Sequence, residues 1–220
     1  MGGGGDSRIP SILQAATPSD INVVVKTYSF DPEVAAVQIA SWVEEFKPAL
    51  IIGESLGSLH AIGISGIPHL YVSPALNAPF YFEFMAWLTL LPGISRLFDR
   101  IYKPREGDRQ PLHFCYKTLR KYLSHRRCAL TEDNVSGYHF AFFGKQDHYR
   151  KYGVVSIRTW IKHFGNCYSV YDGTHFMEEE FIFLDLLPKI YEVLSVNKLN
   201  TNVNMDNICV SKCICLILLV

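Results

Sequence analysis

The residues best suited to chemistry in this sequence are Ser55, Asp147 and His175, each of which follows a segment with the pattern of a buried strand. Ser55 stands in Gly53-Glu54-Ser55-Leu56-Gly57, after the apolar run at residues 49–52 and before a helical pattern of small residues. This context is typical of a serine nucleophile on a sharp, strained turn, where glycine lets neighbouring backbone approach closely. Taken alone, the pentapeptide also fits a glycine-rich turn whose serine only caps a helix.

A serine hydroxyl is a weak nucleophile at neutral pH and needs an adjacent base. His175, in Gly173-Thr174-His175-Phe176, is the candidate base that would take the proton of Ser55 and return it to the leaving group. Asp147, which ends Gly144-Lys145-Gln146-Asp147, is the candidate acid that would fix the tautomer of the histidine. Asp172 is a rival acid, three residues before His175.

The elements around these residues predict an α/β fold. Strand patterns occur at residues 21–28, 49–52, 68–74, 138–143 and 166–171, and helical patterns occur at residues 9–16, 32–46 and about 178–194. Alternating strands and helices imply a parallel sheet with right-handed crossovers. Ligands of such sheets bind at the carboxyl ends of the strands, where Ser55 would lie.

Residues 77–130 interrupt this alternation, because they are aromatic and helical without a strong strand pattern. They predict an inserted helical cap over the site. Phe80, Phe84 and Trp87 are candidate substrate-binding residues, since ligand pockets are mostly apolar. Between Arg100 and Arg127 there are nine basic and two acidic residues, a local balance of nine minus two, or +7. Such a run either forms an ordinary solvent-exposed helix face or attracts an anionic substrate or an acidic carrier protein.

The 220-residue length and the hydrophobic content of 49% predict one domain, at residues 1–195, with a sizeable core. The formal net charge of zero gives no electrostatic case for nucleic acid as a partner. Residues 196–220 are atypical, and we expect a disordered or non-native tail. The tail's apolar end is too short for a membrane-spanning helix, which needs about 20 residues. Without a signal peptide or paired cysteine spacing, a cytoplasmic setting is the default.

Three segments occur in the order nucleophile, acid, histidine: the pentapeptide around Ser55, the loop that ends at Asp147 and the loop around His175. In this the chain resembles the α/β-hydrolase family over roughly residues 1–195. The resemblance implies a mostly parallel sheet sandwiched by helices, with an inserted helical cap. It favours Asp147 over Asp172, because the acid of this family stands at the end of its own strand. It also implies an oxyanion hole made by backbone amides, those of Leu56 and of Gly2, Gly3 or Gly4.

The resemblance implies a serine hydrolase that cleaves a carboxylic ester or thioester of a small molecule through an acyl-enzyme. This chemistry needs no cofactor, and the histidines show no metal-ligand pairing. Two alternatives remain open: a non-catalytic ligand-binding protein of the same fold, and a hydrolase of amide or carbon–carbon bonds. The oligomeric state is left open by the sequence.

Overall fold

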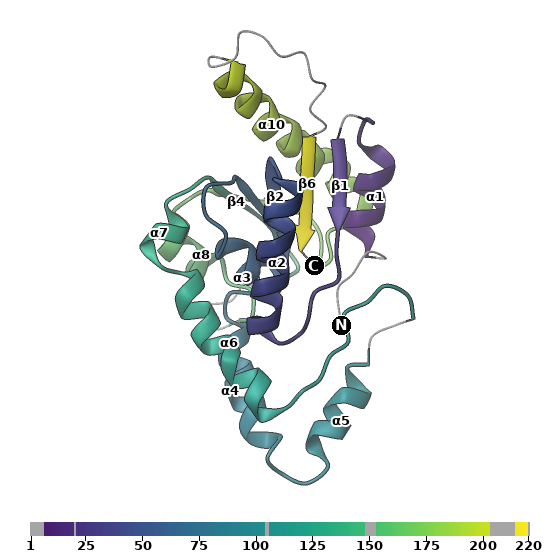
Figure 1. Cartoon of the computed structure of the whole chain (residues 1–220), viewed down its shortest axis with the longest axis vertical. Helices are drawn as coiled ribbons and strands as arrows, with labels where there is room; N and C mark the ends of the chain where they lie inside the picture. The colour runs from purple at the N-terminus through teal and green to yellow at the C-terminus, as the bar shows by residue number, and fades with distance from the viewer. Residues whose placement is uncertain (1–6, 20, 104–105, 148–152, 203–213, 220) are drawn as a thin grey trace.

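The computed structural model describes residues 7–19, 21–103, 106–147, 153–202 and 214–219, and these form a parallel sheet with helices on both faces (Figure 1). The strands are β1 (Ile21–Val25), β2 (Leu50–Glu54), β3 (His69–Val72), β4 (His139–Gly144), β5 (Tyr168–Tyr171) and β6 (Ile214–Leu219). Their order across the sheet is β1-β6-β2-β3-β4-β5, and every neighbouring pair is parallel. The predicted α/β class and parallel sheet are confirmed.

The helices follow the strands in the expected alternation. They are α1 (Arg8–Ala16), α2 (Pro32–Phe46), α3 (Gly57–Ile62), α4 (Ala78–Leu88), α5 (Ile94–Ile101), α6 (Tyr116–Ala129), α7 (Glu132–Val135), α8 (Ile157–Phe164), α9 (Glu179–Phe181), the π-helix η1 (Ile182–Leu186) and α10 (Leu187–Asn202). The start of α2 shows why the predicted and observed bounds agree. Pro32 occupies its first turn and the Asp31 carboxylate accepts a hydrogen bond from the Glu33 N–H, so the helix has a defined N-terminus.

The sheet separates two hydrophobic cores, because successive residues of a strand point to opposite faces. On one face, Ile51 and Tyr71 pack against α2, α3, α6 and α8. On the other face, Ile52 and Leu70 pack against α1, η1 and α10. The central strand β2 is buried at every position, as expected for a strand that is covered on both faces.

The packing around Gly53, near the end of β2, explains why glycine stands at this position of the pentapeptide around Ser55. A Cβ added to Gly53 would lie 2.8 Å from the Cα of Ser58 in α3 and 3.1 Å from the Cβ of Ala61. The absence of a side chain therefore lets α3 pack directly on the strand that leads to Ser55.

A helical insertion separates β3 from β4, as predicted, and consists of α4, α5, α6 and α7. It lies largely beyond the carboxyl ends of the strands (Figure 1). It is joined to the core through Tyr122 of α6, whose hydroxyl donates a hydrogen bond to the Phe30 carbonyl at 2.9 Å. The ring of Phe82 in α4 lies edge-on to Tyr122 at a centroid distance of 5.0 Å. This packing fixes α4 and α6 relative to α2.

Part of the C-terminal segment is ordered, although we expected a disordered or non-native tail at residues 196–220. Residues 214–219 form β6 between β1 and β2, with Leu216 opposite Val23 and Ile217 opposite Ile51. Their sequence, Ile-Cys-Leu-Ile-Leu-Leu, suits a strand covered on both faces, and Ile217 and Leu219 are buried. The pattern of a short apolar run does not by itself show that the run forms a strand. The neighbouring strands with which it pairs decide this.

Within the described part of the chain, we find no helix with both the length and the hydrophobicity needed to cross a membrane.

Candidate active site

The structure brings Ser55, His175 and Asp147 together in one hydrogen-bonded chain at the carboxyl ends of β2, β4 and β5. The Ser55 Oγ lies 3.0 Å from the His175 Nε2, and the His175 Nδ1 lies 3.0 Å from the Asp147 Oδ2. With its proton on Nδ1, the imidazole donates to the carboxylate and accepts from the serine hydroxyl. The Asp147 side chain is only 4% exposed, while that of His175 is 25% exposed. The carboxylate that orients the imidazole is therefore buried, while the imidazole itself is partly exposed to solvent.

Ser55 stands on a strained turn. Its φ is +50°, a left-handed conformation that non-glycine residues adopt at a cost. The surrounding backbone holds it there, since the Ser55 N–H donates to the Val72 carbonyl at 2.9 Å and the Ser55 carbonyl accepts from the Ala75 N–H at 3.0 Å. The end of β3 and the following loop therefore hold the turn and fix the direction of the Ser55 hydroxyl.

Asp147 is placed by the close approach of two loops at the ends of β4 and β5. A Cβ at Gly144 would lie 2.2 Å from the Thr174 carbonyl oxygen, so only glycine permits this packing. The Gln146 N–H donates to the Gly173 carbonyl at 2.9 Å. The rival acid Asp172 points elsewhere, because its side chain is 69% exposed and forms an ion pair with Lys145.

The loop that carries His175 is held on both sides of the histidine. The Tyr171 hydroxyl donates to the Thr174 carbonyl at 2.6 Å, and the Thr174 hydroxyl donates to the Glu178 carboxylate at 2.7 Å. The Arg8 guanidinium donates to the Met177 carbonyl at 3.4 Å, and Met177 itself is buried. These contacts preorganise the position of the imidazole.

The expected oxyanion donors are only partly visible. Leu56 directly follows Ser55 and precedes the first residue of α3, where backbone N–H groups have no acceptor within the helix. Gly2, Gly3 and Gly4, the other expected donors, lie outside the described residues.

Glu54 is a residue of this site that the sequence analysis did not single out. Its side chain is buried on the same face of β2 as Ile52. Burial raises the pKa of its carboxyl to about 7, although the positive charges of His175, Arg8 and Arg109 oppose the rise. The alternation of side chains along β2 assigns Glu54 to the face of Ile52, and the elements packed on that face bury it.

This burial predicts a specific pH dependence of stability. Between pH 4.5 and about 7 the folded state retains a proton on Glu54 that the unfolded state has lost, so the free energy of unfolding falls as pH rises through this window. Glu54→Gln removes this effect. Relative to wild type, the variant should therefore gain about 2–3 kcal/mol of stability between pH 5 and pH 8.

Urea unfolding at the two pH values measures this difference. The exposed Glu45 provides the control, since Glu45→Gln should leave the difference from wild type nearly the same at both pH values. A Glu54→Gln variant whose stability relative to wild type does not change with pH would refute the assignment.

The three predicted substrate-binding residues do not share one environment. Phe80 and Phe84 line a pocket of about 880 Å³ between α4 and α8. Trp87 instead packs against Tyr116 at a centroid distance of 5.3 Å. Among the described residues that line the pocket, neither Ser55 nor His175 is found.

The described residues contain no group of three or more His, Cys, Asp or Glu side chains arranged to hold a metal ion. Comparisons with models of known protein families and with curated protein sequences gave no match.

Proposed function

We propose that this protein is a serine hydrolase of the α/β-hydrolase type, which cleaves a carboxylic ester or thioester through an acyl-enzyme. The observation that carries the proposal is the chain of hydrogen bonds from Ser55 through His175 to Asp147, at the carboxyl ends of a parallel sheet. The strained backbone of Ser55 supports it, because strain of this kind persists where the surrounding structure maintains it and clusters at functional sites.

In the proposed mechanism each of these residues has one role. The Ser55 Oγ attacks the substrate carbonyl carbon while the His175 Nε2 takes its proton, and Asp147 stabilises the imidazolium that forms. The Leu56 N–H is suited to donate to the oxygen of the tetrahedral intermediate, an interaction typically worth about 3 kcal/mol of barrier. The imidazolium then protonates the departing alkoxide or thiolate, which leaves the acyl group on Ser55. Water, activated by the same imidazole, releases the acid.

Labelling with a fluorophosphonate tests this proposal directly. The probe forms a covalent adduct only with an activated serine, so intact mass should show one adduct per chain and peptide mapping should place it on Ser55. Ser55→Ala should abolish the adduct, and Ser41→Ala, on the exposed side of α2, should retain it. An adduct mapped to another residue would contradict the proposal. A folded protein that takes up no probe would favour a ligand-binding role for the fold.

A further inference from the structure

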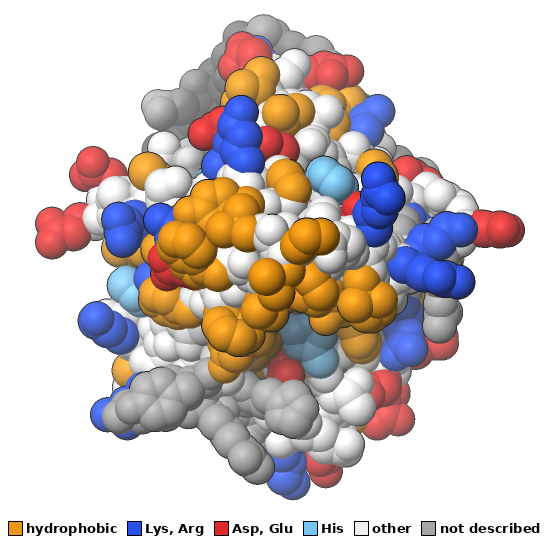
Figure 2. Space-filling model, turned by 90° about the horizontal axis from the view of Figure 1, so that it is seen from below, with side chains coloured by type: hydrophobic (Ala, Val, Ile, Leu, Met, Phe, Trp, Pro, Cys, Tyr) orange, Lys and Arg blue, Asp and Glu red, His pale blue; other side chains and the backbone are white. Residues whose placement is uncertain are grey.

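The pocket between α4 and α8 has an apolar wall that the proposed hydrolase chemistry does not use. Phe80, Tyr81 and Phe84 of α4 line it, and all three side chains are well exposed. Further exposed hydrophobic side chains belong to α4 and α5, among them Trp87, Leu97 and Ile101. Figure 2 shows a hydrophobic surface at the end of the molecule where these two helices lie. A volume of about 880 Å³ is within the range of small-molecule sites.

The opposite side of the pocket is basic. Arg126 of α6 lines it together with Lys162 and His163 of α8, and no carboxylate is among the described residues that line it. The Arg126 guanidinium lies 4.7 Å from the centre of the Phe80 ring, and its Nε donates to the Leu76 carbonyl at 2.6 Å. The cation is therefore fixed at the boundary between the apolar wall and the basic side.

Arg126 and Lys162 disfavour a further positive charge in this pocket. Burial lowers the pKa of His163, and the charges of Arg126 and Lys162 lower it further. Burial also lowers the pKa of Arg126. A bound anion would relieve this repulsion and the loss of hydration together.

The two helices that form the pocket are held at a defined distance. The Asn77 amide, just before α4, donates to the Gly153 carbonyl at 2.9 Å and to the Thr159 hydroxyl of α8 at 3.1 Å. The Asn77 N–H also donates to the Val154 carbonyl at 3.1 Å. The pocket is thus built into the fold, which limits the entropy lost on ligand binding.

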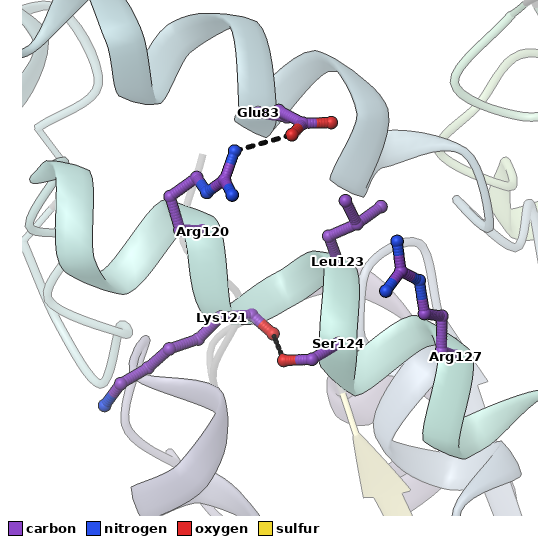
Figure 3. A pocket seen from close by; sticks show the side chains of 6 residues that line it. All are labelled: Glu83, Arg120, Lys121, Leu123, Ser124 and Arg127. Carbon is purple, nitrogen blue, oxygen red and sulfur yellow. Dashed lines mark hydrogen bonds and ion pairs between the residues drawn. The ribbon is translucent and has the colours of Figure 1, made fainter.

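A second basic pocket, between α4 and α6, provides the contrast (Figure 3). Arg120 there forms an ion pair with Glu83 at 2.6 Å. Lys121 points away from that pair and forms its own ion pairs with Asp31 and Glu33. Carboxylates thus already neutralise two of the three cations that line this second pocket, Arg120 and Lys121 but not Arg127, so an anion would gain less there.

We propose that the pocket between α4 and α8 binds a single-chain anionic amphiphile. The aliphatic chain lies on Phe80, Tyr81 and Phe84, and the carboxylate or phosphate head lies between Arg126, Lys162 and His163. The pocket contains none of the three residues of the hydrogen-bonded chain at Ser55. The proposal therefore does not depend on hydrolysis.

Calorimetric titration of the full chain with decanoate and with decyl phosphate, both below their critical micelle concentrations, tests the proposal. Both should bind, while decyltrimethylammonium should not, and inorganic phosphate should bind at least about tenfold more weakly because it lacks the chain. Ser55→Ala should leave the affinity unchanged. Equal affinity for the cationic amphiphile would overturn the proposal. Phosphatidylglycerol vesicles are titrated in parallel, and binding to the vesicles without binding to decyl phosphate would also overturn it.

Two exposed residues allow substitutions that spare the core. Lys162→Glu and Phe84→Asp should each weaken decyl phosphate binding about tenfold or more, by adding a negative charge at the head and chain positions respectively. Lys117→Glu, an exposed charge reversal on α6 outside the pocket, is the control and should bind as wild type does. Wild-type affinity in Lys162→Glu, or loss of binding in Ser55→Ala alone, would show that the ligand binds elsewhere.

Discussion

Ser55→Ala is expected to lower the turnover of an activated ester such as p-nitrophenyl butyrate by about 10⁵- to 10⁶-fold. The reason is that the covalent route disappears altogether when the nucleophile of a serine–histidine–aspartate unit is removed. The remaining rate would come from substrate binding and from the oxyanion donors. Initial rates corrected for spontaneous hydrolysis measure the effect.

The control for this substitution is Ser41→Ala, which changes an exposed serine on α2 and should retain wild-type turnover. Thermal unfolding of both variants shows whether the fold is intact. Hydrolysis in a folded Ser55→Ala variant that stays within tenfold of wild type would assign the nucleophile to another residue.

Asp147→Asn is expected to lower turnover by about 10⁴-fold with little loss of stability. An asparagine keeps the size of the side chain but favours the wrong tautomer of His175, so the Nε2 atom can no longer accept the serine proton. Asp172→Asn is the matched comparison, because that carboxylate is exposed and pairs with Lys145 rather than with the histidine. We expect less than a threefold change there, as is usual for a surface ion pair.

Steady-state rates and urea unfolding of both variants separate a catalytic effect from a structural one. If Asp172→Asn were the more damaging substitution, the role of the acid would move to that residue. If both were mild, the hydrogen bond between Asp147 and His175 would be structural.

Local sequence patterns determined much of the fold. The start of α2 follows from Asp31 and Pro32, which together specify the beginning of a helix without reference to the rest of the chain. The apolar run before Gly53 predicted β2 because a strand covered on both faces needs apolar residues at every position. Ser55 could also be singled out from the sequence, because its turn is built from contiguous residues.

Contacts between distant segments decided the rest. Both Asp147 and Asp172 follow strands. The loops after β4 and β5 pack closely at Gly144 and Thr174, and Asp147 contacts His175, whereas Asp172 is exposed and pairs with Lys145. The apolar run at residues 214–219 carries no local information about its partners. It pairs with β1 and β2 because the tertiary structure offers two strand edges and a hydrophobic layer on each face.

The aromatic run in α4 shows the same division between local pattern and tertiary structure. The sequence specified a helix rich in aromatic residues, but it could not show which side chains would share a pocket. Phe80 and Phe84 lie opposite α8, whereas Trp87 packs on Tyr116 of α6. The burial of Glu54 has a similar origin, since its pKa depends on what covers the strand rather than on its neighbours in the chain. Periodicity assigns a side chain to a face, and only the elements packed on that face determine its environment.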